Sequence, residues 1–323
     1  MPAEPNAAAA TAVTVDRPRV GTLVVVGVGL IGGSFALALR AAGRVGAVVG
    51  VGRGRANLDT ARDLGIVDRV VALDGDWPAE VTAADLVLLA APVAQYPGLL
   101  AAMAGRLGPR TIVTDAGSTK QDVIAAARAA LGADFGRFVP GHPIAGTEHS
   151  GAGAAFATLF RQRNVVLTPL PETDPAATAT VAGLWEACGG RVRVLEPAAH
   201  DRVFAAVSHL PHLLAFGLVD AFAARPDADD IFRFAASGFR DFTRIAASSP
   251  EMWRDISLAN RDALLAEVAA FRTQIDRLAE MIAAGDGAGL EAVFARARKA
   301  RRDWEARSGA TPAAVPADGP RES

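Results

Sequence analysis

The stretch that decides the fold is Gly27-Val28-Gly29-Leu30-Ile31-Gly32, which follows the apolar run Thr22–Val26 and precedes the helix-like segment Ser34–Ala42. In this pattern the first glycine permits a tight turn, the second lets the backbone approach a pyrophosphate, and the third lets helix and strand pack closely. The helix N-terminus then offers free N–H groups to phosphates. These six residues therefore predict a dinucleotide-binding turn, with a purely structural glycine turn as the alternative.

Strand and helix patterns alternate along the following residues. The expected strands are Ala47–Val51, Leu86–Ala90, Thr111–Thr114, Phe138–Val139, Val165–Thr168 and Val192–Leu195, and the expected helices are Asn57–Leu64 and Lys120–Leu131. Such alternation is typical of a parallel sheet covered on both faces. We therefore expect an α/β Rossmann-type dinucleotide-binding domain over residues 19–196.

After Pro197 the strand runs disappear and apolar residues recur at helical spacing. The segments are Asp201–Ala224, Asp229–Ile245, Pro250–Ala284 and Gly289–Arg307. An apolar stripe in the third segment predicts a buried core or a dimer face, and it consists of Trp253, Ile256, Leu264, Val268, Phe271, Ile275, Leu278 and Ile282. We expect an all-α domain over residues 197–307, and disordered tails at 1–18 and 308–323.

Composition excludes several classes of function. The chain has 323 residues, which suits about two domains, and its net charge of −2 provides no basic field for nucleic acid or an anionic membrane. The single cysteine, Cys188, cannot form an internal disulfide, and no Cys/His metal spacing exists. No signal peptide or membrane span is visible. We expect a cytoplasmic protein without a metal.

The residues after the second and third expected strands bear on the cofactor. Gly52-Arg53-Gly54-Arg55 has no acid nearby before Asp59, although an acid at this place would accept a hydrogen bond from the ribose of NAD. Arg53 and Arg55 could instead pair with a 2′-phosphate, which slightly favours NADP; two solvated loop arginines would leave NAD or NADP open. Ala91-Pro92-Val93 is expected to border the nicotinamide half, unless it is a plain strand-ending turn.

Two loops carry candidate chemistry. Ser118 stands between a strand and a helix, where it is a candidate N-cap that could also hydrogen-bond a substrate. The stretch from Gly141 to Gly151, GHPIAGTEHSG, places His142 directly after a strand. A neutral imidazole on such a loop can accept a proton near pH 7, although a loop histidine is also a common structural hydrogen-bonding group.

Two further motifs lie in the helical part. Ser208-His209-Leu210-Pro211-His212 puts two histidines on one helical face, where substrate contact or packing is favoured because no third metal ligand is visible. Arg244 ends the stretch Gly238–Arg244, and Trp253 lies in Met252–Asp255. Arginines among aromatic residues suit carboxylate recognition; ion pairing on a helix surface is the alternative.

Taken in order, GHPIAGTEHSG, SHLPH, FRDFTRIA and MWRDI resemble the prephenate/arogenate dehydrogenases, from about Leu23 to beyond Trp253. The resemblance implies a Rossmann-type domain, then a helical domain that forms a homodimer. It also implies oxidative decarboxylation of prephenate or arogenate, in tyrosine biosynthesis, with hydride transfer to NAD+ or NADP+. Arg53 differs from the pattern of this family, because many members have an acidic residue after the second strand.

The resemblance also implies roles by position. His142 matches the catalytic histidine, and Ser118 the serine that supports this histidine and the substrate. The substrate-pocket matches are Glu148, linked to gating, Ser208, His212, Arg244, which binds a carboxylate, and Trp253. Two alternatives share the architecture. A β-hydroxyacid dehydrogenase uses a lysine early in the helical domain, but no lysine lies between Lys120 and Lys299. A non-enzymatic NADP-binding sensor fits less well with His142, His212 and Arg244.

Overall fold

The structure is a computed structural model that describes residues 19–147 and 149–308. Nearly all of the two expected tails therefore lies outside the described residues. The chain forms two compact units that divide between Leu264 and Leu265, and each is described by itself. The expected domain limits at residues 19, 197 and 307 stay predictions.

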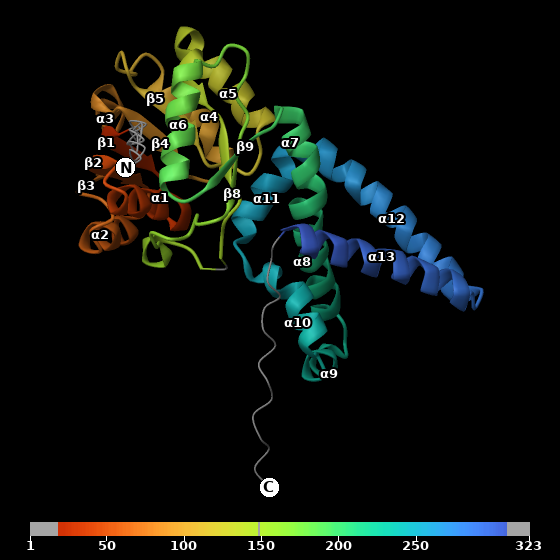
Figure 1. Cartoon of the computed structure of the whole chain (residues 1–323). Coiled ribbons are helices and arrows are strands. Elements are labelled where there is room, and N and C mark those ends of the chain that lie inside the picture. Colours follow the sequence, from red (N-terminus) through yellow and green to blue (C-terminus); the bar gives the residue numbers. More distant parts are fainter. Residues whose placement is uncertain (1–18, 148, 309–323) are drawn as a thin grey trace, which may run out of the picture. The chain divides into compact units, whose positions relative to one another are not determined.

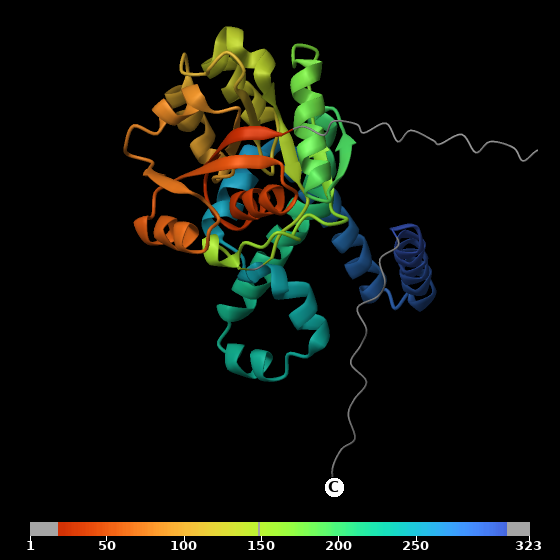
Figure 2. The same ribbon diagram turned by 60° about the vertical axis from the view of Figure 1, so that its left-hand side comes forward.

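A six-stranded parallel sheet in the order β3-β2-β1-β4-β5-β6 forms the centre of the first unit (Figures 1 and 2). Its strands are β1 Val20–Val26, β2 Val45–Gly52, β3 Arg69–Ala72, β4 Leu86–Leu89, β5 Ile112–Asp115 and β6 Phe138–Val139. This is the Rossmann strand order, whose direction of winding reverses between β1 and β4. The predicted Rossmann-type fold is confirmed.

Helices cover both faces of this sheet. They are α1 Leu30–Ala41, α2 Arg55–Asp63, α3 Pro78–Ala83, α4 Tyr96–Met103, α5 Gln121–Leu131 and α6 Pro175–Ala187. Alternate residues of β1 belong to two hydrophobic clusters: Leu23 and Val25 to the cluster with helices α1 and α6, Val24 and Val26 to the cluster with α4 and α5. The period of two along a strand therefore gives the domain one core on each face.

A second sheet was not predicted. It has the order β7-β8-β9, with β7 Gly141–Pro143 antiparallel to β8 Asn164–Leu167, and β8 parallel to β9 Arg191–Val194. His142, which we expected on a loop, lies on β7 opposite Val166. That expectation was wrong because a three-residue strand that contains glycine and proline has no readable period.

The helical part begins at Pro197. It comprises α7 Pro197–Phe204, a π-helical turn Ala205–His209, α8 Leu210–Ala223, α9 Ala228–Arg233, α10 Ser237–Thr243, α11 Pro250–Ala259, α12 Arg261–Ala283 and α13 Gly287–Ser308. The single helix predicted over 250–284 is broken at Asn260, whose buried amide bonds to the carbonyl of Asp201. The helix predicted over 229–245 is broken after Arg233.

One helical run among the described residues, Pro197–Ala223, is long and apolar enough to cross a membrane by length and composition. No such segment was expected from the sequence. The run carries His200, Asp201 and His209, which are buried and hydrogen-bonded within the first unit. These polar contacts make the run part of the folded unit.

The apolar stripe divides into a buried and an exposed part. Ile256 and Leu264 are buried in the first unit. In the second unit Phe271, Ile275 and Ile282 are 36%, 47% and 68% exposed. The buried-core alternative therefore holds only for the part of the stripe before Leu265.

Gly32→Ala tests the packing of α1 against the sheet. A Cβ at this position would lie 2.4 Å from the carbonyl oxygen of Gly27 and 2.7 Å from Val25 Cγ1. We expect the free energy of unfolding, measured by denaturant titration, to fall by about 1–3 kcal/mol. The control is Gly98→Ala in α4, where a Cβ meets nothing within 4 Å, so stability should hold or rise. Native stability of Gly32→Ala would contradict the packing.

Candidate active site

The glycine turn after β1 is tightly packed at Gly27 and open at Gly29. Gly27 has a φ of +100°, and a Cβ there would lie 2.5 Å from the carbonyl oxygen of Ala90. A Cβ on Gly29 would meet no protein atom within 4 Å, so packing does not explain this glycine. No acidic residue stands in the first turn of α1. The turn therefore fits a bound anionic group, and the role of Gly29 toward it stays a prediction.

The other cofactor candidates lie at the carboxyl ends of neighbouring strands. Ala91 and Pro92 are half-buried and Val93 is buried, directly after β4 and beside the glycine turn. Arg53 follows β2 and is exposed, and its Nη1 lies 3.9 Å from Glu251 Oε1. Ligands of open parallel sheets bind at this edge. Their contacts with a cofactor stay predictions.

A completely buried ion pair between Asp115 and Lys120 holds the strand that carries His142. Asp115 Oδ1 accepts a hydrogen bond from the N–H of Gly141 at 2.9 Å, and Lys120 Nζ donates to the carbonyl of Gly141 at 2.7 Å. Burial raises the pKa of Asp115, whereas the Lys120 ammonium lowers it. Both polar groups of Gly141 are thus bound, which fixes the backbone next to His142.

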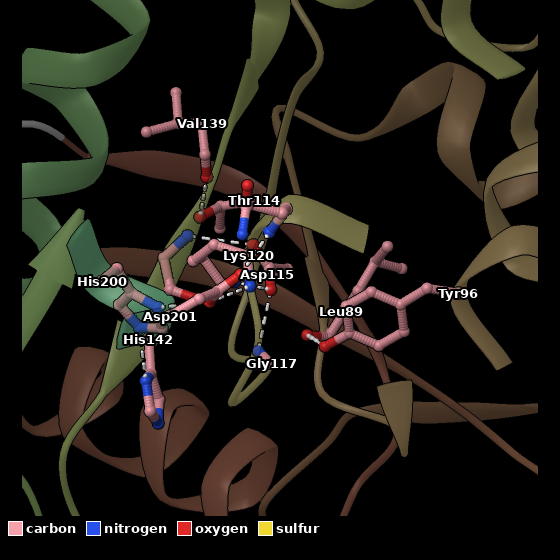
Figure 3. Close-up of polar contacts among 12 residues, drawn as sticks. Leu89, Tyr96, Thr114, Asp115, Gly117, Lys120, Val139, His142, His200 and Asp201 are labelled. Carbon is pink, nitrogen blue, oxygen red and sulfur yellow. Dashed lines mark hydrogen bonds and ion pairs between the residues drawn. The ribbon is translucent and has the colours of Figure 1, made fainter. Parts of the chain in front are cut away.

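His142 stands at the end of a chain of polar contacts (Figure 3). Its Nδ1 lies 2.9 Å from His200 Nε2, and His200 Nδ1 lies 2.8 Å from Asp201 Oδ1. Both side chains beyond His142 are buried, and Phe204 packs against the two imidazole rings. Neither His200 nor Asp201 was predicted from the sequence, because no local pattern links them to His142, which lies 58 positions before His200.

The same Asp201 carboxylate binds the N-terminus of α5. Its two oxygens accept hydrogen bonds from the N–H groups of Lys120 and Gln121, each at 2.9 Å. The N-cap role predicted for Ser118 is therefore wrong, because α5 begins at Gln121 and a distant carboxylate caps it. Ser118 is half-buried in the preceding turn, and its hydroxyl makes no hydrogen bond with the described residues.

These contacts determine which nitrogens carry protons. Burial raises the pKa of Asp201, but bonds from His200 and two backbone N–H groups outweigh it, so the net pKa is lowered and the group is an ionised acceptor. His200 must then donate through Nδ1 and accept through Nε2. His142 in turn donates through Nδ1. Its Nε2 keeps a lone pair and has no hydrogen bond with the described residues.

His142 and His200 are both neutral near pH 7. Burial lowers the pKa of His142 well below its usual value, and electrostatic interactions with His200, Lys120 and His209 lower this pKa further. Burial also lowers the pKa of His200. A neutral imidazole with a free Nε2 is the form that accepts a proton.

A second group gathers residues expected in the substrate pocket. His212 donates from Nδ1 to the carbonyl of Ser208 at 2.8 Å, and its ring stacks on Trp253 with centroids 3.5 Å apart. Burial lowers the pKa of His212, and the nearby charge of Arg244 lowers it as well. Burial lowers the pKa of His209 to about 4. The structure thus brings these residues into one neighbourhood.

Asn260 joins the two groups. Its amide Nδ2 lies 2.8 Å from the carbonyl of Asp201 and 3.1 Å from His209 Nδ1. Glu148 falls outside the described residues. Among residues 19–147 and 149–308, no group of three or more His, Cys, Asp or Glu side chains is placed to hold a metal ion.

Comparison with known proteins gives matches along both parts of the chain. The family model of the prephenate dehydrogenase nucleotide-binding domain matches residues 35–194, and that of the prephenate dehydrogenase dimerization domain matches residues 196–296. The chain is 38% identical to the cyclohexadienyl dehydrogenase of Zymomonas mobilis, over 86% of this chain and 94% of that protein.

Two solved structures of prephenate and arogenate dehydrogenases are similar to this chain in sequence and fold. Prephenate dehydrogenase from A. aeolicus, in complex with hydroxyphenyl propionate and NAD+, is 36% identical with a TM-score of 0.81, covering 88% of this chain and 98% of that one. Arogenate dehydrogenase from Synechocystis is 30% identical with a TM-score of 0.72, covering 88% and 99%.

Asp201→Asn tests the chain of contacts. An amide can donate to His200, which would allow the opposite tautomer and a protonated Nε2 on His142. Positioned acid–base catalysis is worth about 10²–10⁴-fold, so we expect turnover to fall by about 10²-fold. The control Asp174→Asn replaces the carboxylate that caps α6 through the N–H of Ala176, and it should leave turnover unchanged. Equal turnover in the two variants would show that the hydrogen bonds from His142 through His200 to Asp201 do not contribute to catalysis.

The same variant has a pH signature. Because the pKa of Asp201 is lowered in the fold, its ionised form stabilises the fold above the unfolded-state pKa of about 3.9. This stability is lost as pH falls through the folded pKa. The stability difference between native protein and Asp201→Asn, measured by denaturant titration, should therefore narrow below about pH 4. A difference that does not depend on pH would contradict this.

Proposed function

Because the chain belongs to the prephenate dehydrogenase family, we propose that it catalyses the oxidative decarboxylation of prephenate, arogenate or both, in tyrosine biosynthesis. The chain is an oxidoreductase with a Rossmann-type domain for a nicotinamide cofactor. The observation that carries the proposal is the neutral His142, held by His200 and Asp201 so that Nε2 retains its lone pair. A dehydrogenase for a hydroxyl substrate needs such a base.

The chemistry follows from the groups present. Both substrates are cyclohexadienols with a ring carboxylate. His142 Nε2 accepts the hydroxyl proton, and the imidazolium that forms donates from Nδ1 to His200, which donates to the Asp201 carboxylate. A bound nicotinamide would supply the acceptor for the hydride that leaves the carbinol carbon, and the ring carboxylate would leave as carbon dioxide. The buried chain from His142 to Asp201 thus stabilises charge that develops during the reaction.

Substrate binding is proposed for the second group of residues. Arg244 provides the cation for a substrate carboxylate, close to His212 and to the ring of Trp253. We also propose that Ser118 contacts the substrate hydroxyl, that Ser208 orients His212, and that Glu148 controls access. The hydrogen bond between His212 and the Ser208 carbonyl supports this orienting role.

The cofactor is NAD+ or NADP+. The turn Gly27–Gly32 would hold its phosphates, Arg53 its adenosine ribose, and Ala91–Val93 its nicotinamide half. Support comes from the close packing at Gly27 and Gly32 and from the open space at Gly29. The basic Arg53 suits NADP+, whereas the A. aeolicus relative is described with NAD+.

We further propose a homodimer, in the cytoplasm. The match to the dimerization domain over residues 196–296 and the exposed apolar side chains Leu265, Ile275 and Ile282 support a face that a second copy covers. The cytoplasmic location rests on the sequence alone.

Assaying His142→Asn beside the native chain tests the function. Prephenate and arogenate are each supplied with NAD+ and NADP+, and formation of reduced cofactor is followed. We expect turnover with at least one pair, and a loss of at least about 10²-fold in the variant with little change in cofactor affinity. A native chain that binds cofactor but turns over neither substrate would overturn the proposal, as would full activity of the variant.

Arg244→Ala should act differently. Removing a group that binds the substrate carboxylate in ground and transition states alike raises KM and leaves kcat nearly unchanged. The matched control is Arg233→Ala, whose guanidinium pairs with Asp230 on the surface of α9. Steady-state kinetics over a range of substrate concentrations give both constants. An unchanged KM in Arg244→Ala would remove Arg244 from the site.

A further inference from the structure

Arg53 occupies the position that selects between the two nicotinamide cofactors. It directly follows β2, which pairs with β1 so that the N–H of Gly27 donates to the carbonyl of Val51 at 2.8 Å. In this fold the residue after the second strand borders the adenosine ribose, and an acid there accepts from the 2′-hydroxyl of NAD. An arginine alone at that place would recognise a 2′-phosphate.

A carboxylate reaches the same place from the helical part. Glu251 lies in the first turn of α11, and its Oε1 is 3.9 Å from Arg53 Nη1. The side chains of Arg53 and Glu251 are 58% and 50% exposed, so a ligand can reach both groups. Isolated exposed pairs contribute little to folding, so stability alone gives no reason for this one.

The position of Glu251 is fixed by the core beneath it. Met252, the next residue, packs against the cluster of β1, β4 and α5 residues, and Ile256 of the same helix is buried there. Ser249 Oγ accepts a hydrogen bond from the N–H of Met252 at 3.3 Å and caps the helix. α11 therefore presents Glu251 to the end of β2 from a rigid base.

The nearest acid in sequence does not take this role. Asp59 of α2 is bonded to Arg55 at 3.1 Å and to Arg62 at 3.4 Å. Among the described residues, Glu251 is the carboxylate that pairs with Arg53.

We propose that Glu251 is a specificity-determining residue that supplies, from α11, the acid missing after β2. This rests on the proposed function. The Glu251 carboxylate competes with a 2′-phosphate for Arg53 and repels that phosphate, whereas it can accept a hydrogen bond from a 2′-hydroxyl. The pair thus favours NAD over NADP, against the preference that Arg53 alone would give.

Titrating NADH and NADPH into the full chain, followed by cofactor fluorescence, tests this without any substrate. Glu251→Gln should bind NADPH about 5–10-fold more tightly and change NADH affinity less than about 2-fold. Arg53→Gln should weaken the binding of NADPH. The control Asp59→Asn, which removes an acid that pairs with Arg55 and Arg62, should leave the ratio of the two dissociation constants unchanged.

An unchanged ratio in Glu251→Gln overturns the proposal, and so does weaker NADPH binding in that variant. The expected shift in a chain that turns over neither prephenate nor arogenate would support the role of Glu251 while the proposed reaction fails. A native chain that binds neither cofactor would overturn both.

Discussion

The carboxylate of Asp201 is the point on which the site depends. Its oxygens bind the first N–H groups of α5, which follows the central sheet, and the ring of His200 beside it. Its own backbone carbonyl accepts a bond from Asn260, where α11 and α12 meet. One buried anion therefore joins the dinucleotide-binding domain to the helical part, and it is kept ionised by the donors that surround it.

A second constraint on the site is that its histidines resist protonation. Four of the chain's five histidines lie in this neighbourhood, and burial lowers the pKa of each. Three of them also oppose the protonation of another histidine: His200 and His209 lower the pKa of His142, and His212 lowers the pKa of His209. In the resting protein they are hydrogen-bonding groups with defined tautomers. In the proposed reaction, the proton that the substrate gives to His142 produces an imidazolium, and the hydrogen bonds from His142 to His200 and from His200 to Asp201 stabilise this charge.

The sequence predicted the features that local patterns encode. The glycine turn, the run of strands and helices, and the change to helices at Pro197 each follow from residues close together in the chain. The features that could not be predicted from the sequence depend on contacts between residues that are far apart in the chain. The prediction that Ser118 caps α5 was wrong because Asp201 caps this helix. The prediction of one helix across residue 260 was wrong because the side-chain amide of Asn260 bonds to Asp201 and His209. The pairing of Arg53 with Glu251 joins residues from two segments that no spacing relates.

The most direct test of this account is the tautomer of His142, measured by nitrogen-15 NMR of the protein labelled at histidine, with His142→Asn used to assign its signals. The account predicts a neutral ring at pH 7 with the proton on Nδ1 and a lone pair on Nε2. A ring protonated on Nε2, or an imidazolium at that pH, would contradict it, because His142 would then have no free Nε2 lone pair with which to act as the base.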